Sequence, residues 1–201
     1  MILYCIRHGE STYNAEGRIQ GQSDVPLSEL GWRQGRAAAR AMVGRGVEAV
    51  FASPLKRAKY TADMVAEALD LDVQTDERLK EVDCGVFQDR MRQEILREYA
   101  GMIEQWRSGR PDFAFPQGES RQSIIRRGHE VLDEISKTPY ETVAVVSHGG
   151  LLLAGIKSLL GLRPTDQPLS MANTSISKLQ FGPDNQVELL EFDRTDHLND
   201  I

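Results

Sequence analysis

Short apolar runs that stop at polar residues predict the strands of a sheet. The run Ile2–Ile6 ends at a charged residue, and the run Val143–Val146 ends at Ser147. Apolar runs of this length, bounded by polar residues, are typical of buried strands. Further strands are expected at 48–52, 175–181 and 187–192, the last two joined by a turn at 182–185.

Helical spacing of apolar residues predicts the segments between these strands. Ser28 is the expected N-cap of a helix that runs to about Gly44. Ser53-Pro54 is expected to open the next helix, since proline is tolerated in a first turn. Ser120 begins a long helix with one apolar face. Helices are also expected at 90–106, interrupted at Gly101, and at 151–160, whereas 77–87 is expected to be irregular and 109–118 a loop.

The order of these strands and helices indicates an α/β sandwich. No linker, repeat or low-complexity tract interrupts the 201 residues, so we expect one domain over 1–201. Within it, the segment at about 88–117 is expected to form a helical, lid-like insertion.

The overall charge and composition restrict the partners of the chain. A net charge of −6 argues against broad nucleic-acid binding, although a few arginines can still form a local site for a small anion. Cys5 and Cys84 provide no disulfide framework and fit a reducing cytosol. No apolar stretch approaches the roughly 20 residues that cross a bilayer, and no basic region precedes the first apolar run. We therefore expect a cytoplasmic protein with no membrane or nucleic-acid partner.

Two strand ends carry a histidine followed by glycine. Arg7-His8-Gly9-Glu10 follows the first strand, and Ser147-His148-Gly149-Gly150 follows the strand at 143–146. Ligands of open α/β sheets bind at the carboxyl ends of the strands. Arginine suits phosphate, and glycine lets the backbone approach a ligand closely. A single tetrad of this kind is more often a turn or a surface cluster than a site, so the repetition is what indicates an anion site.

Arg57 and Glu81 are further candidates, each with an ordinary alternative. Arg57 is expected in the first turn of a helix, where free amides and the helix dipole favour anions; the alternative is a solvated helix residue. Glu81 lies between hydrophobic residues, where partial burial would favour its protonated form near neutral pH. Most glutamates, in contrast, are simple surface charges.

Together these motifs resemble the histidine phosphatase superfamily, also called phosphoglycerate mutase-like. Each motif alone is common, but their order along nearly the whole chain is specific. The resemblance implies a three-layer α/β/α sandwich with a mostly parallel central sheet. The matching landmarks are Arg7-His8-Gly9-Glu10-Ser11, Asn14, Gly17-Arg18-Ile19-Gln20-Gly21, Ser53-Pro54-Leu55-Lys56-Arg57-Ala58, Glu81, Gly118-Glu119-Ser120 and Ser147-His148-Gly149.

The resemblance also implies a role for each matching side chain. His8 would attack phosphorus and become a phosphohistidine, which requires a neutral and oriented ring. Glu81 would protonate the leaving oxygen and then activate water. The phosphoryl oxygens would be surrounded by Arg7, Arg57 and His148, with Asn14, Gln20, Gly21 and Gly149 completing the phosphate pocket.

This scheme requires neither a metal nor a cofactor, because arginines and histidines supply the charge. The competing idea that His8 and His148 bind zinc lacks a ligand pair such as His-Glu-x-x-His or Cys-x-x-Cys. His129 and His197 are assigned structural roles. Glu10 and Ser11 are expected to support or cap the site rather than to take part in the chemistry.

Three functions are compatible with the resemblance: a phosphomonoester hydrolase, a phosphoglycerate mutase and a non-catalytic phospholigand-binding module. The family's mutases carry Arg-His-Tyr-Gly just after the acidic residue, followed by an arginine pair. Here Val82-Asp83-Cys84-Gly85 follows Glu81, and Arg126-Arg127 lies in a later helix. The phosphatase branch, acting on a small phosphorylated metabolite, is therefore favoured, and the silent module is least favoured because every expected catalytic residue type is intact. The resemblance allows a homodimer, although the sequence supplies no interface.

Substrate specificity is assigned to Arg90–Phe115. The family's phosphoserine phosphatases carry histidine where this chain has Cys84, which argues against amino-acid recognition. The bulky residues of the segment either line a lid or merely pack the subdomain, and both interpretations stay open. These residues are Trp106, Arg107, Arg110, Phe113 and Phe115.

Overall fold

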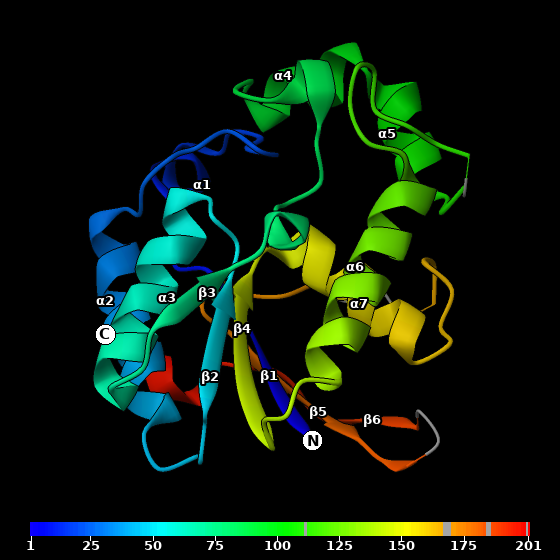
Figure 1. The fold of residues 1–201 in the computed structure, drawn as a ribbon. Coiled ribbons are helices and arrows are strands. Elements are labelled where there is room, and N and C mark those ends of the chain that lie inside the picture. The colour runs from blue at the N-terminus through cyan, green and yellow to red at the C-terminus, as the bar shows by residue number, and fades with distance from the viewer. Residues whose placement is uncertain (111, 167–169, 184–185, 200) are drawn as a thin grey trace.

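The computed structural model describes residues 1–110, 112–166, 170–183, 186–199 and 201, and within these ranges six strands form one sheet (Figure 1). Their order across the sheet is β3-β2-β4-β1-β5-β6. The first four run parallel, and β5 and β6 form an antiparallel extension, so the mostly parallel sheet is confirmed. The strands are β1 (Ile2–Arg7), β2 (Ala49–Ala52), β3 (Val73–Thr75), β4 (Thr142–Ser147), β5 (Ile176–Phe181) and β6 (Val187–Arg194).

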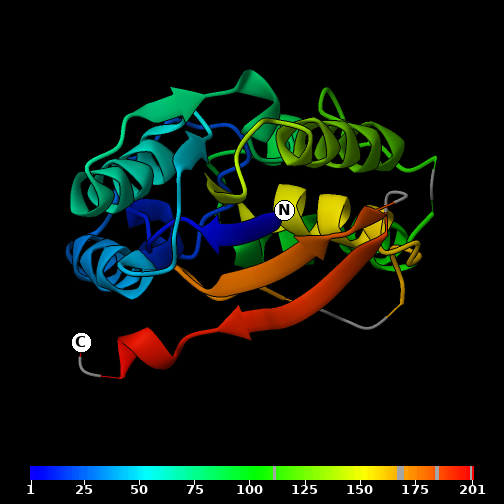
Figure 2. The same ribbon diagram turned by 60° about the horizontal axis from the view of Figure 1, so that its bottom comes forward.

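Helices cover both faces of the sheet. α2 and α3 lie together on one side and α6 and α7 on the other (Figure 2). No helix among the described residues combines the length and the apolar character that a bilayer span needs. The helices are α1 (Thr12–Glu16), α2 (Glu29–Met42), α3 (Lys56–Leu69), α4 (Arg92–Glu98), α5 (Ala100–Arg107), α6 (Arg121–Ser136) and α7 (Gly149–Leu159), with short 3-10 helices η1 (Glu77–Leu79), η2 (Gly85–Phe87) and η4 (Asp196–Leu198).

The alternation of side chains in β1 explains the layers. Leu3 and Cys5 pack into a core shared with α6 and α7, whereas Tyr4 and Ile6 pack into a core shared with α2 and α3. Successive side chains of a strand point to opposite faces, so a strand that is apolar throughout is buried on both sides. The three-layer α/β/α sandwich is thereby confirmed.

The pairing of β1 with β4 places the two histidine-glycine motifs next to each other. Arg7 is in register with Ser147, and the His8 amide donates to the Ser147 carbonyl oxygen at 2.9 Å. Both strands run in the same direction, so both chains leave the sheet at its carboxyl edge. His8 and His148 therefore emerge side by side, although they are far apart in the sequence.

The structure corrects several expected helix boundaries. α3 begins at Lys56, with Leu55 as its N-cap, rather than at Ser53-Pro54. The expected helix at 90–106 is broken at Tyr99, which ends α4 and precedes α5, and not at Gly101. α7 begins at Gly149, earlier than the predicted residue 151, because His148 serves as its N-cap.

A short strand and a short α-helix were not predicted, and one predicted turn lies only partly within the described residues. β3 consists of Val73-Gln74-Thr75, which is largely exposed and lacks an apolar run. α1 is a single short helix after the first motif, with no buried residue to reveal its periodicity. Of the turn predicted at 182–185, residues 184 and 185 lie outside the described ranges.

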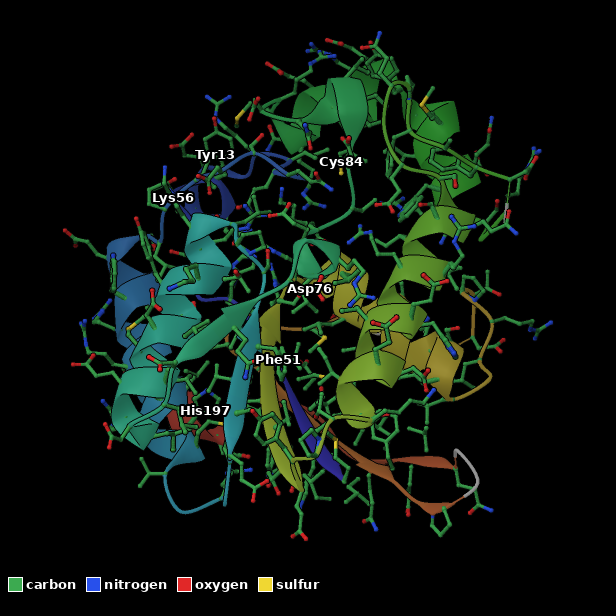
Figure 3. The ribbon with its side chains drawn as sticks, in the orientation of Figure 1. Tyr13, Phe51, Lys56, Asp76, Cys84 and His197 are labelled. Atoms are coloured by element: carbon green, nitrogen blue, oxygen red, sulfur yellow. The ribbon has the colours of Figure 1, made fainter. Side chains whose placement is uncertain are left out.

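The expected lid-like segment contains α4 and α5, which lie above the carboxyl edge of the sheet in Figure 1. Phe113 and Phe115 are buried, and their ring centroids lie 5.5 and 4.7 Å from that of Trp106. Arg110 instead pairs with Asp112 at the surface. These contacts favour the packing interpretation for the two phenylalanines. Cys84 lies just beneath the helices of this segment (Figure 3).

Two glycines allow α6 and α7 to pack closely. A methyl group at Gly128 would lie 2.9 Å from the Gly155 nitrogen and 3.0 Å from the Leu151 carbonyl oxygen. These are backbone atoms, so they cannot move aside as a flexible side chain would. The contact between the two helices therefore depends on the absence of a side chain at this crossing.

We expect Gly128→Ala to destabilise the protein by about 1–2 kcal/mol, because overpacking costs more than the roughly 1 kcal/mol that alanine gains in a helix. The measurement is the free energy of unfolding in urea. Gly101→Ala is the matched control, since a methyl group there meets nothing within 4 Å. Equal stabilisation by the two substitutions would show that the helices are not in close contact at Gly128.

Candidate active site

His8 is a buried, oriented and uncharged imidazole directly after β1. It is 2% exposed, and its Nδ1 lies 2.6 Å from the Gly9 carbonyl oxygen. A carbonyl oxygen only accepts, so Nδ1 carries the hydrogen and Nε2 keeps its lone pair. Burial lowers the pKa of His8 well below its usual 6.5, and the charges of Arg57 and Arg7 lower it further. The ring is therefore neutral near pH 7, with Nε2 able to act as a nucleophile.

Arg57 places a positive charge beside that nitrogen. It is fully buried in the first turn of α3, and its Nε donates to His8 Nε2 at 3.3 Å. Its two terminal nitrogens donate to the carbonyl oxygens of Ser23 and Gly21, each at 2.7 Å. Burial lowers the pKa of Arg57 to about 10, and the Glu81 carboxylate opposes this shift. Arg57 is thus a fixed cation at neutral pH and not the solvated residue of the alternative interpretation.

Arg7 contributes a second, partly buried guanidinium group to the same edge. It donates from Nη1 to the Met171 carbonyl oxygen. Its Nε is buried and has no partner among the described residues. A Cβ atom at Gly149 would lie 3.5 Å from this nitrogen, so the start of α7 passes against Arg7. Buried polar atoms are seldom left unpaired, which identifies this N–H as a donor available to a ligand.

His148 lies beside His8, with 5.1 Å between the ring centroids. Its Nε2 is 2.8 Å from Ser53 Oγ, and that hydroxyl accepts from the Leu55 amide at 3.3 Å. The hydroxyl can therefore donate its hydrogen to Nε2, which leaves Nδ1–H as a donor. Nδ1 is buried and lacks a partner among the described residues. Burial also lowers the pKa of His148 well below 6.5, so a neutral His148 offers one unused hydrogen bond.

The Glu81 side chain is hydrogen-bonded to backbone amides at the N-terminus of α7. Its carboxylate accepts from the amides of Gly150 at 3.1 Å and Leu151 at 3.0 Å, and from its neighbour Val82 at 3.0 Å. Amide donors at a helix N-terminus stabilise an ionised carboxylate. These three contacts fix the orientation of the Glu81 carboxylate at the start of α7.

Arg127 on α6 fastens the segment that carries Glu81. Its guanidinium donates to the carbonyl oxygens of Arg78 at 2.7 Å, Lys80 at 2.6 Å and Glu81 at 3.3 Å. It also forms a largely buried ion pair with Glu119, with oxygen distances of 2.6 and 3.1 Å. One side chain thus fixes the backbone on which the carboxylate is mounted.

The remaining predicted phosphate-pocket residues support this edge in the structure. Asn14 Oδ1 accepts from the Ser11 amide at 3.2 Å, and Gln20 Oε1 accepts from Ser11 Oγ at 2.6 Å. Ser11 caps α1 through a reciprocal capping box with Asn14, as its assignment to capping predicted. The Gly21 carbonyl oxygen accepts from Arg57. These residues surround the site, and the contacts that the structure shows are to other protein groups.

Several supporting residues were not identified from the sequence. The Thr61 hydroxyl accepts from the Gly9 amide at 3.0 Å and donates to the Arg57 carbonyl oxygen at 2.8 Å. Asn173 Nδ2 donates to the His8 carbonyl oxygen at 3.0 Å. Thr61 and Asn173 lie in distant segments and belong to no local motif, so only the folded chain reveals them.

Gly9 is required by a close contact within the protein, and its predicted close approach to a ligand stays a prediction. A Cβ atom there would lie 2.6 Å from the Gly31 carbonyl oxygen in the first turn of α2. Glu10 continues this contact, since its carboxylate accepts from the Ser28 hydroxyl at 2.7 Å. Gly9 therefore lets the loop after β1 pass against the start of α2.

The other candidate groups lie outside this cluster. His129 Nδ1 is 3.1 Å from Ser158 Oγ, between α6 and α7. His197 belongs to η4, which packs against α2 away from the lid segment (Figure 3). Cys5 and Cys84 are free and buried, and burial raises the pKa of each thiol to about 12. Among the described residues, no group of three or more histidine, cysteine or acidic side chains could hold a metal ion.

Comparisons with known proteins agree with this geometry. Residues 3–193 match the family model of the histidine phosphatase superfamily (branch 1). The chain is 37% identical over 181 residues to the probable phosphoglycerate mutase GpmB of Cronobacter sakazakii, covering 89% of this chain and 84% of that protein.

Two similar proteins of known structure are named as phosphatases. A mycobacterial glucosyl-3-phosphoglycerate phosphatase in complex with VO3 superposes with a TM-score of 0.89 at 32% identity, covering 96% of this chain and 99% of the other. A phosphoserine phosphatase from Entamoeba histolytica, in complex with phosphoserine, gives 0.88 at 29% identity and covers 98% of both chains.

The two buried neutral histidines predict a loss of stability in acid. As the pH falls below about 6.5, the unfolded chain binds protons at His8 and His148 that the folded protein excludes, so the free energy of unfolding decreases. The decrease is at most about 1.4 kcal/mol per pH unit for each histidine. Urea unfolding between pH 5 and 6.5 should therefore show a shallower decrease for His148→Gln than for the unmodified protein. Identical slopes would contradict the assignment of a neutral, buried His148.

Proposed function

This chain belongs to the histidine phosphatase superfamily (branch 1), and on that premise we propose that it hydrolyses phosphomonoesters through a phosphohistidine at His8. The observation that carries the proposal is the neutral His8 ring beside the buried Arg57 cation. Arg7 Nε and His148 Nδ1, which have no partner within the described ranges, support it, because a phosphoryl group supplies acceptors for both.

The proposed reaction has two steps. His8 Nε2 forms a bond to phosphorus while the bond to the ester oxygen breaks, and Glu81 gives its proton to that oxygen. Water then attacks the phosphohistidine, Glu81 takes a proton from the water, and inorganic phosphate leaves with His8 restored. The negative charge of the bound phosphoryl group favours the protonated carboxyl that the first step needs.

Fixed cations support a reaction that uses no metal ion or cofactor. Arg57 and Arg7 are held in place before substrate arrives, so their orientation costs little when charge shifts in the transition state. The buried, unpaired thiols of Cys5 and Cys84 support activity in a reducing compartment such as the cytoplasm.

The positions and contacts of Arg126 and Arg127 favour hydrolysis over mutase activity. Arg126 is exposed on α6, and Arg127 is engaged by Glu119 and by backbone carbonyl oxygens. Neither is placed as a free pair for a substrate carboxylate after Glu81. Two similar solved structures are named as phosphatases, which supports hydrolysis, whereas the curated relative described above is named as a probable phosphoglycerate mutase. We propose a small phosphorylated metabolite as the substrate.

The proposal is tested with a metal-free panel of phosphorylated sugars, phosphoserine, ribazole phosphate and 3-phosphoglycerate. We expect phosphate release from at least one ester, and a loss of at least about a thousandfold in kcat for His8→Ala. A rapid quench should trap label on the protein through a bond that is stable in base and labile in acid. His197→Gln is the matched control, since that histidine lines a separate hollow with Arg45.

Three outcomes would contradict the proposal. Activity that persists in His8→Ala would exclude the phosphohistidine. Isomerisation of 3-phosphoglycerate faster than phosphate release would indicate a mutase. Phosphate binding without turnover of any ester would indicate a silent binding module.

Arg127 is expected to act as a positioning residue for Glu81. In Arg127→Met, kcat for an alkyl phosphate should fall about 10- to 100-fold with little change in KM, because proton donation by Glu81 becomes misaligned. The loss should be smaller for p-nitrophenyl phosphate, whose leaving group needs little protonation. Arg126→Met is the control on the same helix. Equal losses for both esters would indicate a general structural defect instead.

A further inference from the structure

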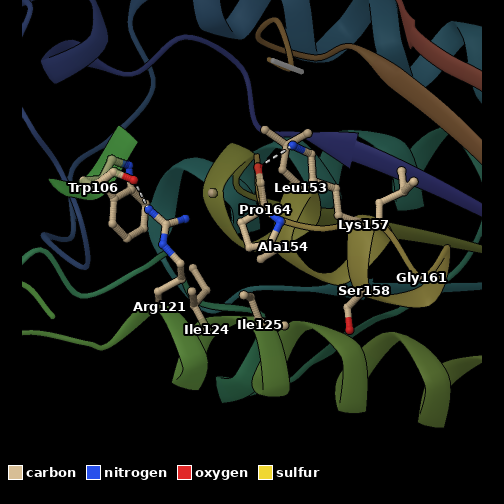
Figure 4. Close-up of a pocket in the computed structure, with 12 residues that line it drawn as sticks. Trp106, Arg121, Ile124, Ile125, Leu153, Ala154, Lys157, Ser158, Gly161 and Pro164 are labelled. Carbon is tan, nitrogen blue, oxygen red and sulfur yellow. Dashed lines mark hydrogen bonds between the residues drawn. The ribbon is translucent and has the colours of Figure 1, made fainter. Parts of the chain in front are cut away.

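A cavity of about 510 Å³ lies between α6 and α7 and is distinct from the histidine cluster (Figure 4). Ile124 and Ile125 of α6 form one wall, and Leu153 and Ala154 of α7 form the other. Trp106 of α5 closes one end. The size is typical of small-molecule sites, which combine apolar walls with a few polar groups.

Arg121 is a buried cation at this cavity. It is 8% exposed, its guanidinium carbon lies 3.9 Å from the Trp106 ring centroid, and Nη2 donates to the Trp106 carbonyl oxygen. Its Nε is buried without a partner among the described residues. Figure 4 shows the side chain extending from the start of α6 toward Trp106, between the two helices.

No acid in the described part of the chain balances the charge of Arg121. Burial lowers its pKa, and no carboxylate of the described residues opposes that shift. Lys157 lines the same cavity and donates to the Pro164 carbonyl oxygen at 2.8 Å. Burial lowers the pKa of Lys157, and the carboxylate of Asp166, which opposes this shift, forms an ion pair with Arg163. None of the described residues that line the cavity is acidic. A buried cation without a counter-charge is costly, and an anionic ligand would relieve that cost.

We propose that this Arg121 cavity binds an anionic group carried on an apolar body. The anion accepts from the Arg121 guanidinium, and the apolar body lies along the isoleucine and leucine walls. The ligand class is therefore an amphipathic carboxylate, sulfonate or phosphate rather than a fully polar metabolite.

The cavity adjoins the candidate active site at Gly150. This glycine lines the cavity, and its amide donates to Glu81 Oε2 at 3.1 Å. The bound anion can thus come from two sources: the leaving-group part of a substrate, which rests on the proposed function, or a separate small molecule. Both share the chemistry that Arg121 recognises.

Trp106 provides a direct reporter, because the chain contains only one other tryptophan, Trp32, whose ring stacks on Tyr60 in α3. In Trp32→Phe, octanoate should produce a saturable change in Trp106 fluorescence. Octanol, which lacks the anion, should bind at least about tenfold more weakly. Performing the titration also in His8→Ala separates binding from turnover, so a failure of the proposed hydrolysis leaves this result interpretable.

The role of the Arg121 guanidinium in binding the anion is tested by Arg121→Met and Arg121→Lys in the Trp32→Phe background. Octanoate affinity should fall at least about tenfold in the first and partly recover in the second, while Arg126→Met leaves it unchanged. Urea unfolding checks that each variant is folded, and calorimetry repeats the titration in case the change at Arg121 alters Trp106 emission.

Inhibition of phosphate release distinguishes the two possible sources of the bound anion, the leaving-group part of a substrate and a separate small molecule. Competitive inhibition by octanoate, with an ω-phosphorylated octanoate preferred over octyl phosphate, supports the leaving-group source. Octanoate binding without competition supports a separate molecule. The proposal is overturned if octanoate gives no saturable signal in Trp32→Phe, with His8 intact or with His8→Ala added. It is also overturned if octanol binds as tightly as octanoate, or if Arg126→Met weakens octanoate binding as much as Arg121→Met does.

Discussion

The placement of two guanidinium groups, one fully buried and one partly buried, beside two buried neutral imidazoles is the constraint on which the site depends. Burial is the main cause that lowers the pKa of His8 and of His148 and holds both in the neutral form, and the charges of Arg57 and Arg7 act in the same direction. The hydrogen bond from His8 Nδ1 to the Gly9 carbonyl oxygen then leaves the lone pair on Nε2. A cluster of positive charge whose Arg7 Nε and His148 Nδ1 have no hydrogen-bond partner in the described part of the chain is complementary to a phosphoryl group.

The carboxylate of this site depends on a different set of contacts. Glu81 is fixed from one side by the amides at the start of α7 and from the other by Arg127, which binds the backbone of the segment that carries it. α6 and α7 meet at Gly128 and Gly155, so the close packing of these helices sets the distance between the two supports. The same helix pair forms the walls of the Arg121 cavity. Stability, acid placement and the proposed ligand site thus share one packing contact.

Much of the architecture could be predicted from local patterns. β1 and β4 were recognisable because they are apolar throughout, as strands buried on both faces are. The N-caps at Ser28 and Ser120 were predicted correctly, since a hydroxyl before an apolar periodic run is a local signal. β3 was missed because it is short, exposed and placed at the sheet edge by pairing with β2. The predicted start of α3 at Ser53-Pro54 was wrong. Ser53 hydrogen-bonds to His148, and Leu55 is the N-cap of the helix.

The sequence by itself determined the family and the fold class, because both follow from short motifs in a fixed order, and the same motifs predicted which side chains react. Tertiary structure alone decided how those side chains are controlled. The tautomer of His8, the ionic surroundings of Glu81 and the role of Arg127 depend on contacts between residues far apart in the chain. Burial and hydrogen-bond direction are properties of such contacts, and a linear pattern does not contain them. The uncompensated charge of Arg121 became visible for the same reason, once α5, α6 and α7 had been brought together.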